Sequence, residues 1–151
     1  MSELPGLPDL PGREALADDL AAMTELYCDL LGCDTVGLCL DVVGRAMCPR
    51  FHVDRVALRL LVTYRGPATE WLDDAAADRS RLGAAAGELS DAQSGLIRDP
   101  GAVGGARPFD IVLLKRCQWP GNEARGAIHR SPAVPAEHAP RVLVALDVVW
   151  P

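Results

Sequence analysis

The spacing of apolar residues changes once along this chain, close to residue 35. Before that point, large apolar side chains recur every three or four residues, which is the period of one face of an α-helix. These residues are Leu16, Leu20, Met23, Tyr27 and Leu30. Gly32 follows them, and glycine readily adopts the left-handed conformation that closes a helix. The pattern predicts one amphipathic helix that ends at Gly32 and packs against a sheet.

Beyond residue 35, runs of β-branched and aliphatic residues of strand length replace the helical period. The predicted strands are Val36–Val43, Val56–Tyr64, Phe109–Leu114, Ala127–His129 and Arg141–Val149. Arg59 interrupts the second run, so part of one face of that strand is expected to be polar or to line a site. The Ala- and Gly-rich stretch 73–105 is predicted to hold one short helix, near Ala75–Leu82, followed by loops.

One helix followed by six to eight short strands argues against a parallel sheet, in which helices connect the strands. The order favours an antiparallel sandwich or barrel. We expect a mainly β fold of the double-stranded β-helix, or jelly-roll, type, with the N-terminal helix packed on it. Residues 1–12 carry three prolines and are predicted to form an extended arm, and residues 13–151 a single jelly-roll domain.

The composition is that of an ordinary globular domain: 151 residues, of which 49% are apolar and 24% charged. The net charge of −6 supplies no basic field, so neither nucleic acid nor an anionic membrane is expected as a partner. No apolar run approaches the roughly 18 residues of a membrane span. Acids and prolines stand where a signal peptide needs a basic start and an apolar centre, so a cytoplasmic location is expected.

In the cytoplasm, the five cysteines are expected to be reduced thiols. Their number is odd and no C-x-x-C occurs, so neither a disulfide framework nor a zinc ribbon is predicted. Cys28 and Cys39 are expected in the apolar core, where a free cysteine behaves as a small hydrophobic residue.

Two fragments concentrate the chemistry: Phe51–Asp54 (FHVD) and Ile128–Pro132 (IHRSP). In an extended strand, residues i and i+2 share a face, so His52 and Asp54 can reach one ion while the residue between them packs on the other side. If His129 lies on a facing strand, the three form a 2-His-1-carboxylate facial triad, which binds a divalent metal and leaves the opposite positions open. The alternative is a surface histidine and aspartate near a turn.

A second ligand set is also open. Cys48 lies four residues before His52, Cys117 lies near the distal motif, and thiolates together with imidazoles suit zinc. Since that set would leave Asp54 without a role, the triad is the preferred hypothesis.

The motifs resemble those of an uncharacterised bacterial family, a domain of unknown function with the pattern FHVD, RLL-TYRGPGTEW, LLKG--WPG, HRSP and R-LL-LD. The matching segments span about two-thirds of the chain, and they are Phe51–Asp54, Arg59–Trp71, Leu113–Gly121, His129–Pro132 and Arg141–Asp147. The chain departs at Ala68, where a second glycine is expected, and at Arg116-Cys117, where a glycine and a variable residue are. Neither departure is expected to touch the ligands. The resemblance implies an association with bacterial zinc-homeostasis genes, including metal-chaperone GTPases.

A more distant resemblance is to the Fe(II)/2-oxoglutarate oxygenases, which are double-stranded β-helices with H-x-D, a distal His and a later basic residue. It implies Fe(II) at the triad, Arg141 as the partner of the far carboxylate of 2-oxoglutarate, and a hydroxyl from Tyr64 beside it. The oxygenases often have Ser or Thr two residues after the arginine, where this chain has Leu143. The alternative for Arg141 is a strand start with its guanidinium in solvent.

Residues beside the motifs are candidates for the surroundings of the site. Arg130 and Ser131 are expected either to orient His129 or to form the turn that leaves its strand. Glu70 is a candidate fourth ligand or general base, and Trp71 a pocket wall or a core residue.

Two functions are consistent with these residues. The first is an oxidoreductase that binds Fe(II) at the triad and 2-oxoglutarate at Arg141, and acts on a small-molecule substrate. The second is a non-catalytic metal-binding or metal-homeostasis module that holds zinc or iron with the same ligands. An open three-ligand site with a basic residue behind it favours the first, and a closed four-ligand site favours the second.

Overall fold

The structure is a computed structural model that describes residues 11–83, 87–134 and 140–149. The chain divides into two compact units, one formed by the segments up to Gly37 and from Val148 onward, the other by Leu38–Asp147. The single domain over residues 13–151 stays a prediction. Of the predicted arm over residues 1–12, residues 1–10 lie outside the described part.

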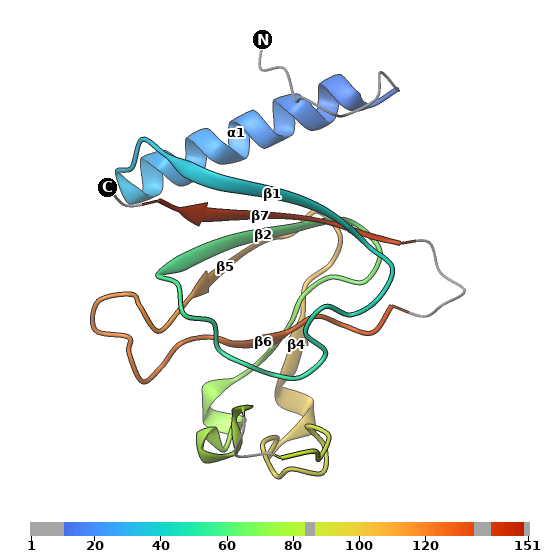
Figure 1. The fold of residues 1–151 in the computed structure, drawn as a ribbon, viewed down its shortest axis with the longest axis vertical. Helices are drawn as coiled ribbons and strands as arrows, with labels where there is room; N and C mark the ends of the chain where they lie inside the picture. The colour runs from blue at the N-terminus through green and yellow to red at the C-terminus, as the bar shows by residue number, and fades with distance from the viewer. Residues whose placement is uncertain (1–10, 84–86, 135–139, 150–151) are drawn as a thin grey trace. The chain divides into compact units, whose positions relative to one another are not determined.

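The first unit contains helix α1 (Arg13–Leu31), drawn in blue in Figure 1. Its buried residues, Leu20, Met23 and Tyr27, belong to the predicted apolar stripe. Gly32 closes the helix in the left-handed conformation, with φ 62° and ψ 37°, as predicted. The packing of this helix against a sheet stays a prediction. Among the helices of the described residues, none combines the length and the apolarity that crossing a membrane requires.

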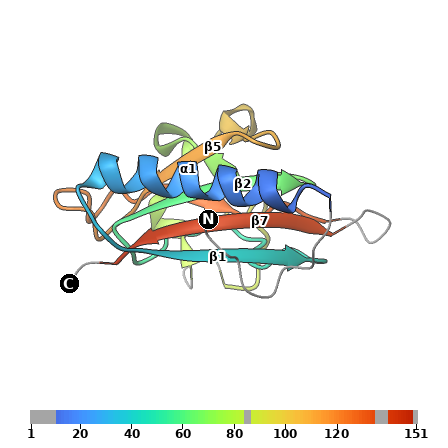
Figure 2. The same cartoon turned by 90° about the horizontal axis from the view of Figure 1, so that it is seen from above.

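Four strands form one sheet in the order β1-β7-β2-β5, which Figure 2 shows from above. They are β1 (Val36–Val43), β2 (Leu58–Arg65), β5 (Ile111–Lys115) and β7 (Arg141–Val148). Strand β2 is antiparallel to both of its neighbours, β5 and β7. All four strands lie within two residues of their predicted ends, because long β-branched runs are the clearest strand signal in the sequence.

A second, smaller sheet has the order β4-β3-β6. Its strands are β3 (Glu70–Leu72), β4 (Val103–Gly105) and β6 (Ile128–Arg130). Only β6 was predicted, because a strand of three residues is too short to show an alternating pattern. The edge of β6 away from β3 makes one more antiparallel bridge, from His129 to His52.

The predicted helix near Ala75–Leu82 is wrong in type. Two 3-10 turns occupy this stretch, η1 (Asp74–Ala76) and η2 (Arg79–Arg81), and a third, η4 (Pro100–Ala102), precedes β4. Each begins after an aspartate whose side chain accepts a hydrogen bond from a backbone N–H two residues on. Such local bonds favour turns over a continuous helix.

The mainly β architecture with one N-terminal helix is confirmed. Paired strands are nested along the chain: β1 lies beside β7, the His52 segment beside β6, β2 beside β5, and β3 beside β4. Across the residues that the structure describes, the two sheets do not close into a barrel, so the jelly roll itself stays a prediction.

One apolar cluster decides which way the H-x-D segment faces. Phe51 is buried in this cluster, and Val53 packs against it. The other buried members are Leu72, Ala76, Ala77, Leu96 and Ile128. Because neighbouring side chains of an extended segment point to opposite sides, His52 and Asp54 face away from this core.

Candidate metal centre

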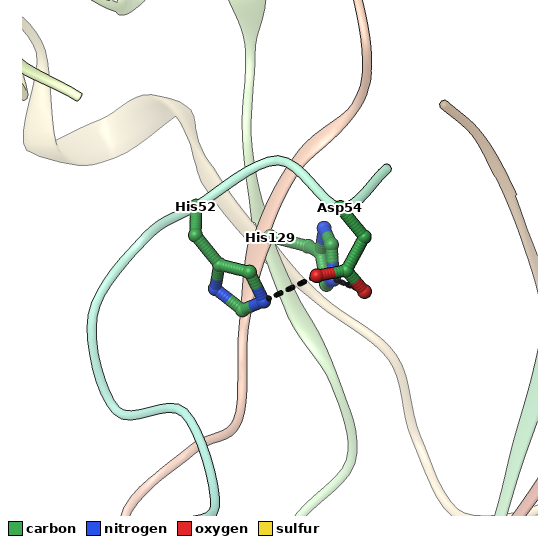
Figure 3. Close-up of side chains that lie close together, drawn as sticks. All are labelled: His52, Asp54 and His129. Carbon is green, nitrogen blue, oxygen red and sulfur yellow. Dashed lines mark ion pairs between the residues drawn. The ribbon is translucent and has the colours of Figure 1, made fainter. Parts of the chain in front are cut away.

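The side chains of His52, Asp54 and His129 converge, as Figure 3 shows. One ligand atom from each lies within 4.8 Å of the other two, and the two imidazole centroids are 4.5 Å apart. His52 Nε2 is 3.2 Å from Asp54 Oδ1, and His129 Nε2 is 3.6 Å from Asp54 Oδ2. The structure therefore contains a His-Asp-His group that could hold a divalent metal.

Backbone pairing brings the two histidines together. The N–H of each donates to the carbonyl oxygen of the other at 3.0 Å. Residues directly opposite in an antiparallel pair place their side chains on the same face, about 5 Å apart. Asp54 returns to that face two residues later. The H-x-D spacing therefore places His52 and Asp54 on one face, as predicted. His52 lies in an isolated bridge, whereas facing strands of a barrel were expected.

Both imidazoles are held in the tautomer that a metal ligand needs. His52 Nδ1 lies 2.9 Å from the carbonyl oxygen of Arg50, and His129 Nδ1 lies 3.1 Å from that of Ala127. Because a carbonyl can only accept, each Nδ1 carries a proton and donates it. Both Nε2 atoms then face the region around Asp54, so the residues fit a metal ion.

His129 is the more buried of the two histidines, with 5% of its surface exposed. Burial is the main cause that lowers its pKa to about 3, and the positive charge of Arg116 lowers it further, against the opposite effect of the bond to Ala127. The ring is therefore neutral at pH 7, and a metal could bind to it without displacing a proton.

A cavity of about 240 Å³ contains the triad. Its walls come from both sheets, with Leu61 on β2 and Leu143 and Ala145 on β7 opposite the histidines. Its charged lining residues are Asp41, Asp54, Arg59, Arg116, Arg130 and Arg141. Arginines outnumber carboxylates in this lining, so the cavity suits an anion beside a metal.

Arg141 begins β7, lines this cavity and is 1% exposed, which excludes the alternative of a guanidinium in solvent. Its Nη1 donates to Ser131 Oγ at 2.8 Å, and its Nη2 to the hydroxyls of Thr69 and Thr63 at 3.0 and 3.3 Å. Its buried Nε has no hydrogen-bond partner among the described residues. Burial lowers the pKa of Arg141 below its ordinary value. The described partners of this cation are therefore hydroxyls, and its charge is open to an anion.

Two arginines that were not assigned to the site hold Asp54. Arg116 is fully buried; it forms an ion pair with Asp54 Oδ2, and its Nη2 lies 3.3 Å from His129 Nε2. The expectation that the departure at residue 116 would not touch the ligands is wrong. The backbone N–H of Arg116 donates to the carbonyl of Ala57, which extends the β2–β5 pairing past the end of β5 and into the cavity.

Arg59 is the second arginine, and the charged interruption of its strand was the signal that indicated a polar face or a site. It binds Asp147 closely, at 2.5 and 2.6 Å, and Asp54 more distantly, at 3.4 Å. One oxygen of Asp54 therefore lies beside His52 and the other beside the two arginines. Such a carboxylate can serve a metal and the arginines at once.

The structure pairs Arg130 with acids instead of with His129. Its Nε donates to Glu70 Oε2 at 2.6 Å, its Nη1 to Asp91 Oδ2 at 3.1 Å, and the guanidinium lies over the ring of Phe51. Glu70 is therefore committed to Arg130 and does not join the ligand group. Ser131 accepts a bond from Arg141, so it supports the arginine and not the histidine.

Two predicted pocket residues lie elsewhere. Tyr64 is on the face of β2 opposite Arg59 and packs edge-on against Phe109, with ring centroids 5.7 Å apart. Trp71 lines a different, larger cavity, and its indole covers Gly104 on the neighbouring strand β4. Strand alternation explains the first displacement, and the missing side chain at residue 104 explains the second.

The alternative zinc set is not assembled. Cys48 lines the triad cavity without joining the ligand group, and Cys117 Sγ donates to the backbone carbonyl of Asp54 at 3.3 Å. Within the described ranges, the group of possible ligands has three members.

Comparison with known proteins gives a family but no activity. No curated protein and no solved structure was found to match the chain. The predicted membership of an uncharacterised family is confirmed: a family described as "Protein of unknown function (DUF1826)" matches residues 1–147, and the chain belongs to it.

Proposed function

We propose that this protein is a metal-dependent oxidoreductase of the Fe(II)/2-oxoglutarate type, with His52, Asp54 and His129 as the metal ligands. One observation carries the proposal: a three-ligand group and a buried arginine with only hydroxyl partners among the described residues line the same cavity. A facial triad leaves metal positions open, and a cation beside it selects an anionic group to fill them. When bound, Fe(II) with 2-oxoglutarate would supply oxidation by O₂.

Arg141 is the residue that would hold the cosubstrate. A guanidinium binds a carboxylate through two parallel N–H bonds, which gives orientation as well as affinity. The hydroxyls of Ser131, Thr63 and Thr69 keep the side chain in place without neutralising its charge. Ser131 and the two threonines would take the place of the Ser or Thr that the oxygenases often have two positions after the arginine, where this chain has Leu143.

Arg116 and Arg59 would keep Asp54 ionised and oriented, because both present N–H groups to its carboxylate. The aromatic residues Phe51, Tyr64 and Trp71 are not among the lining residues of this cavity. Apolar residues that line it include Leu61, Leu143 and Ala145, and they would help to exclude water from the reacting groups.

The strand order supports the fold that the proposal requires. If the His52 segment counts as a strand, the pairs are nested from first-with-last to the two middle strands. A long hairpin rolled into two facing sheets produces this order, which is the jelly-roll arrangement. The ligands would then come from the second strand and the second-last strand, and Arg141 from the last.

The decisive experiment uses protein purified without oxygen and loaded with Fe(II). We expect one equivalent of iron, and slow formation of succinate from 2-oxoglutarate on admission of O₂, even without a substrate. His129→Ala, prepared in the same way, should form none. Absence of succinate, with zinc bound at one equivalent and indifferent to 2-oxoglutarate, would favour the metal-binding module. Tighter binding of zinc than of iron decides nothing alone, because zinc outcompetes iron at most nitrogen and oxygen sites.

A further inference from the structure

The end of helix α1 brings two cysteines together. The helix closes on Gly32 in the left-handed conformation, and the N–H of Cys33 donates to the carbonyl oxygen of Cys28 at 3.1 Å. This bond spans six residues from its donor to its acceptor, which is the longer of the two bonds of a Schellman motif. Cys28 and Cys33 therefore occupy the two ends of that motif.

In a Schellman motif, the side chains at these two ends commonly touch through an apolar contact. Here both are thiols, and the two side chains line the same cavity. Cys28 is half-buried and not in the core position expected from the sequence, and Cys33 is half-buried as well. A disulfide requires two Cβ atoms across a short gap. The contact that commonly joins the two ends of this motif would bring the two thiols toward each other.

Small molecules can reach both thiols. They line an open cavity whose remaining lining residues are Thr24, Glu25, Asp29, Gly32 and Asp34. The three carboxylates make its rim anionic. Burial, the contact with Cys33 and the nearby aspartates raise the pKa of the Cys28 thiol. Because the rim of the cavity is anionic, neutral and cationic reagents are favoured over anionic ones.

We propose that Cys28 and Cys33 form a reversible dithiol–disulfide site, oxidised by small disulfides that carry positive charge and independent of the triad. One thiolate attacks a sulfur of the reagent, forms a mixed disulfide and releases a thiolate that takes up a proton. The second cysteine then attacks the protein sulfur of that mixed disulfide and releases the other half of the reagent as a thiol. Two protein thiols are oxidised and one disulfide is reduced to two thiols.

Two other cysteines lack this arrangement. Cys39 is exposed on β1, where its Sγ donates to Asp41 Oδ2 at 3.3 Å, and it was wrongly expected in the core. Cys117 donates to a backbone carbonyl. Cys39 is the matched control, because it lies six residues after Cys33 and is more exposed than either member of the pair.

The full-length protein is treated with cystamine, a dicationic disulfide, and in parallel with anionic glutathione disulfide. We expect Cys28 and Cys33 to lose their thiols without a lasting adduct, whereas the exposed Cys39 and Cys48 can carry only separate adducts. Cleavage before aspartate cuts ahead of Asp29 and Asp34, so Cys28, Cys33 and Cys39 fall on separate peptides and a Cys28–Cys33 link is read directly. Cystamine should react at least about tenfold faster than glutathione disulfide, and salt should narrow the difference.

Variants complete the test. Cys39→Ser should lose the same two thiols as the wild type, whereas Cys28→Ser or Cys33→Ser should keep one cysteamine adduct on the remaining cysteine. The rate should rise between about pH 7 and pH 9, because the thiolate is the reacting form. Wild-type protein that carries separate adducts at Cys28 and Cys33, or a link that involves Cys39, overturns the proposal. Metal binding at the triad is measured in the same samples and should not change, so failure here is distinct from failure of the oxidoreductase proposal.

Discussion

Two cavities within Leu38–Asp147 differ more in lining than in size. The smaller, about 240 Å³, holds the triad and four arginines. The larger, about 600 Å³, is lined mostly by apolar residues, among them Trp71 and Ile111–Leu114 of β5. Two of its charged residues, Asp74 and Arg79, are paired with each other. The larger cavity has more room, but the smaller has the buried cations and the convergent ligand atoms that chemistry requires.

Strand alternation selects the β7 residues of the smaller cavity: Arg141, Leu143 and Ala145 all line it. On β5, four consecutive residues, Ile111–Leu114, line the larger cavity. One sheet thus presents a charged face to the smaller cavity and an apolar edge to the larger. Substitutions in one cavity should not change the properties of the other, and the following predictions test this difference between the two cavities.

The largest effect is expected from the ligands. Asp54→Ala, His52→Ala and His129→Ala should each weaken divalent metal binding by at least about 100-fold, because even outer partners of a ligand can cost up to that factor. Trp71→Ala, in the larger cavity, should leave metal binding unchanged. Titration calorimetry with Zn²⁺, alongside circular dichroism to verify folding, measures both. Unchanged affinity in His52→Ala would remove the triad from consideration.

Substitution of Arg141 should weaken the binding of 2-oxoglutarate and leave metal binding unchanged. In metal-loaded protein, Arg141→Met should raise the Kd for 2-oxoglutarate about 30- to 100-fold, or about 2–3 kcal/mol, as expected when a buried charge partner is lost. Arg141→Lys keeps the charge but loses the fork of donors, and should fall in between. Arg130→Met is the matched control, since Arg130 lines the same cavity with both acid partners already in place. A larger effect from Arg130 than from Arg141 would contradict the assignment.

The buried state of His129 predicts a dependence of stability on pH. Its pKa is about 3 in the folded protein and about 6.5 when unfolded, so the unfolded chain binds a proton first as the pH falls. The neutral, buried His129 therefore contributes fully to the free energy of unfolding above pH 6.5, and this contribution is lost progressively toward pH 3. Between pH 7 and pH 5, the metal-free protein should lose about 2 kcal/mol of unfolding free energy in urea titrations. His129→Asn should lose less over the same range, and an equal loss would show that other groups cause it.

Arg116 should oppose metal binding, because its guanidinium contacts both Asp54 and Nε2 of His129. Replacement by Met keeps much of the side-chain volume and removes the charge. We expect about tenfold tighter Zn²⁺ binding, or about 1.4 kcal/mol, from reduced repulsion at close range. Weaker binding in Arg116→Met would mean that the orientation of Asp54 by Arg116 matters more than its charge.

The smallest effect concerns the larger cavity. A Cβ on Gly104 would collide with the indole of Trp71, which is 38% exposed and therefore has room to move. Gly104→Ala should cost about 1 kcal/mol of stability and change the Trp fluorescence, while metal affinity stays the same. A change in metal affinity would show that the two cavities are coupled.

The local features of this protein could be predicted from neighbouring residues in the chain. The helical stripe and Gly32 predicted α1, and the β-branched runs predicted five of the strands, because these signals depend on neighbours in the chain. The spacing of His52 and Asp54 predicted a shared face, and it does so because Phe51 and Val53 are both apolar and turn toward the core. The strands of three residues, β3 and β4, carried no such signal.

Contacts between residues far apart in the chain could not be predicted in this way. The bridge that sets His129 opposite His52, the approach of Arg116 to Asp54, and the hydroxyls around Arg141 all depend on strand register. Register also keeps Tyr64 out of the cavity that contains the triad, since a shift of one residue along a strand turns a side chain to the opposite face. Cys28 and Cys33 were counted in the sequence but not paired, because their contact requires the left-handed turn at Gly32 to fold the chain back. Residue types and spacing name the candidate ligands, and the pairing of backbone groups far apart in the chain decides which of them share a cavity.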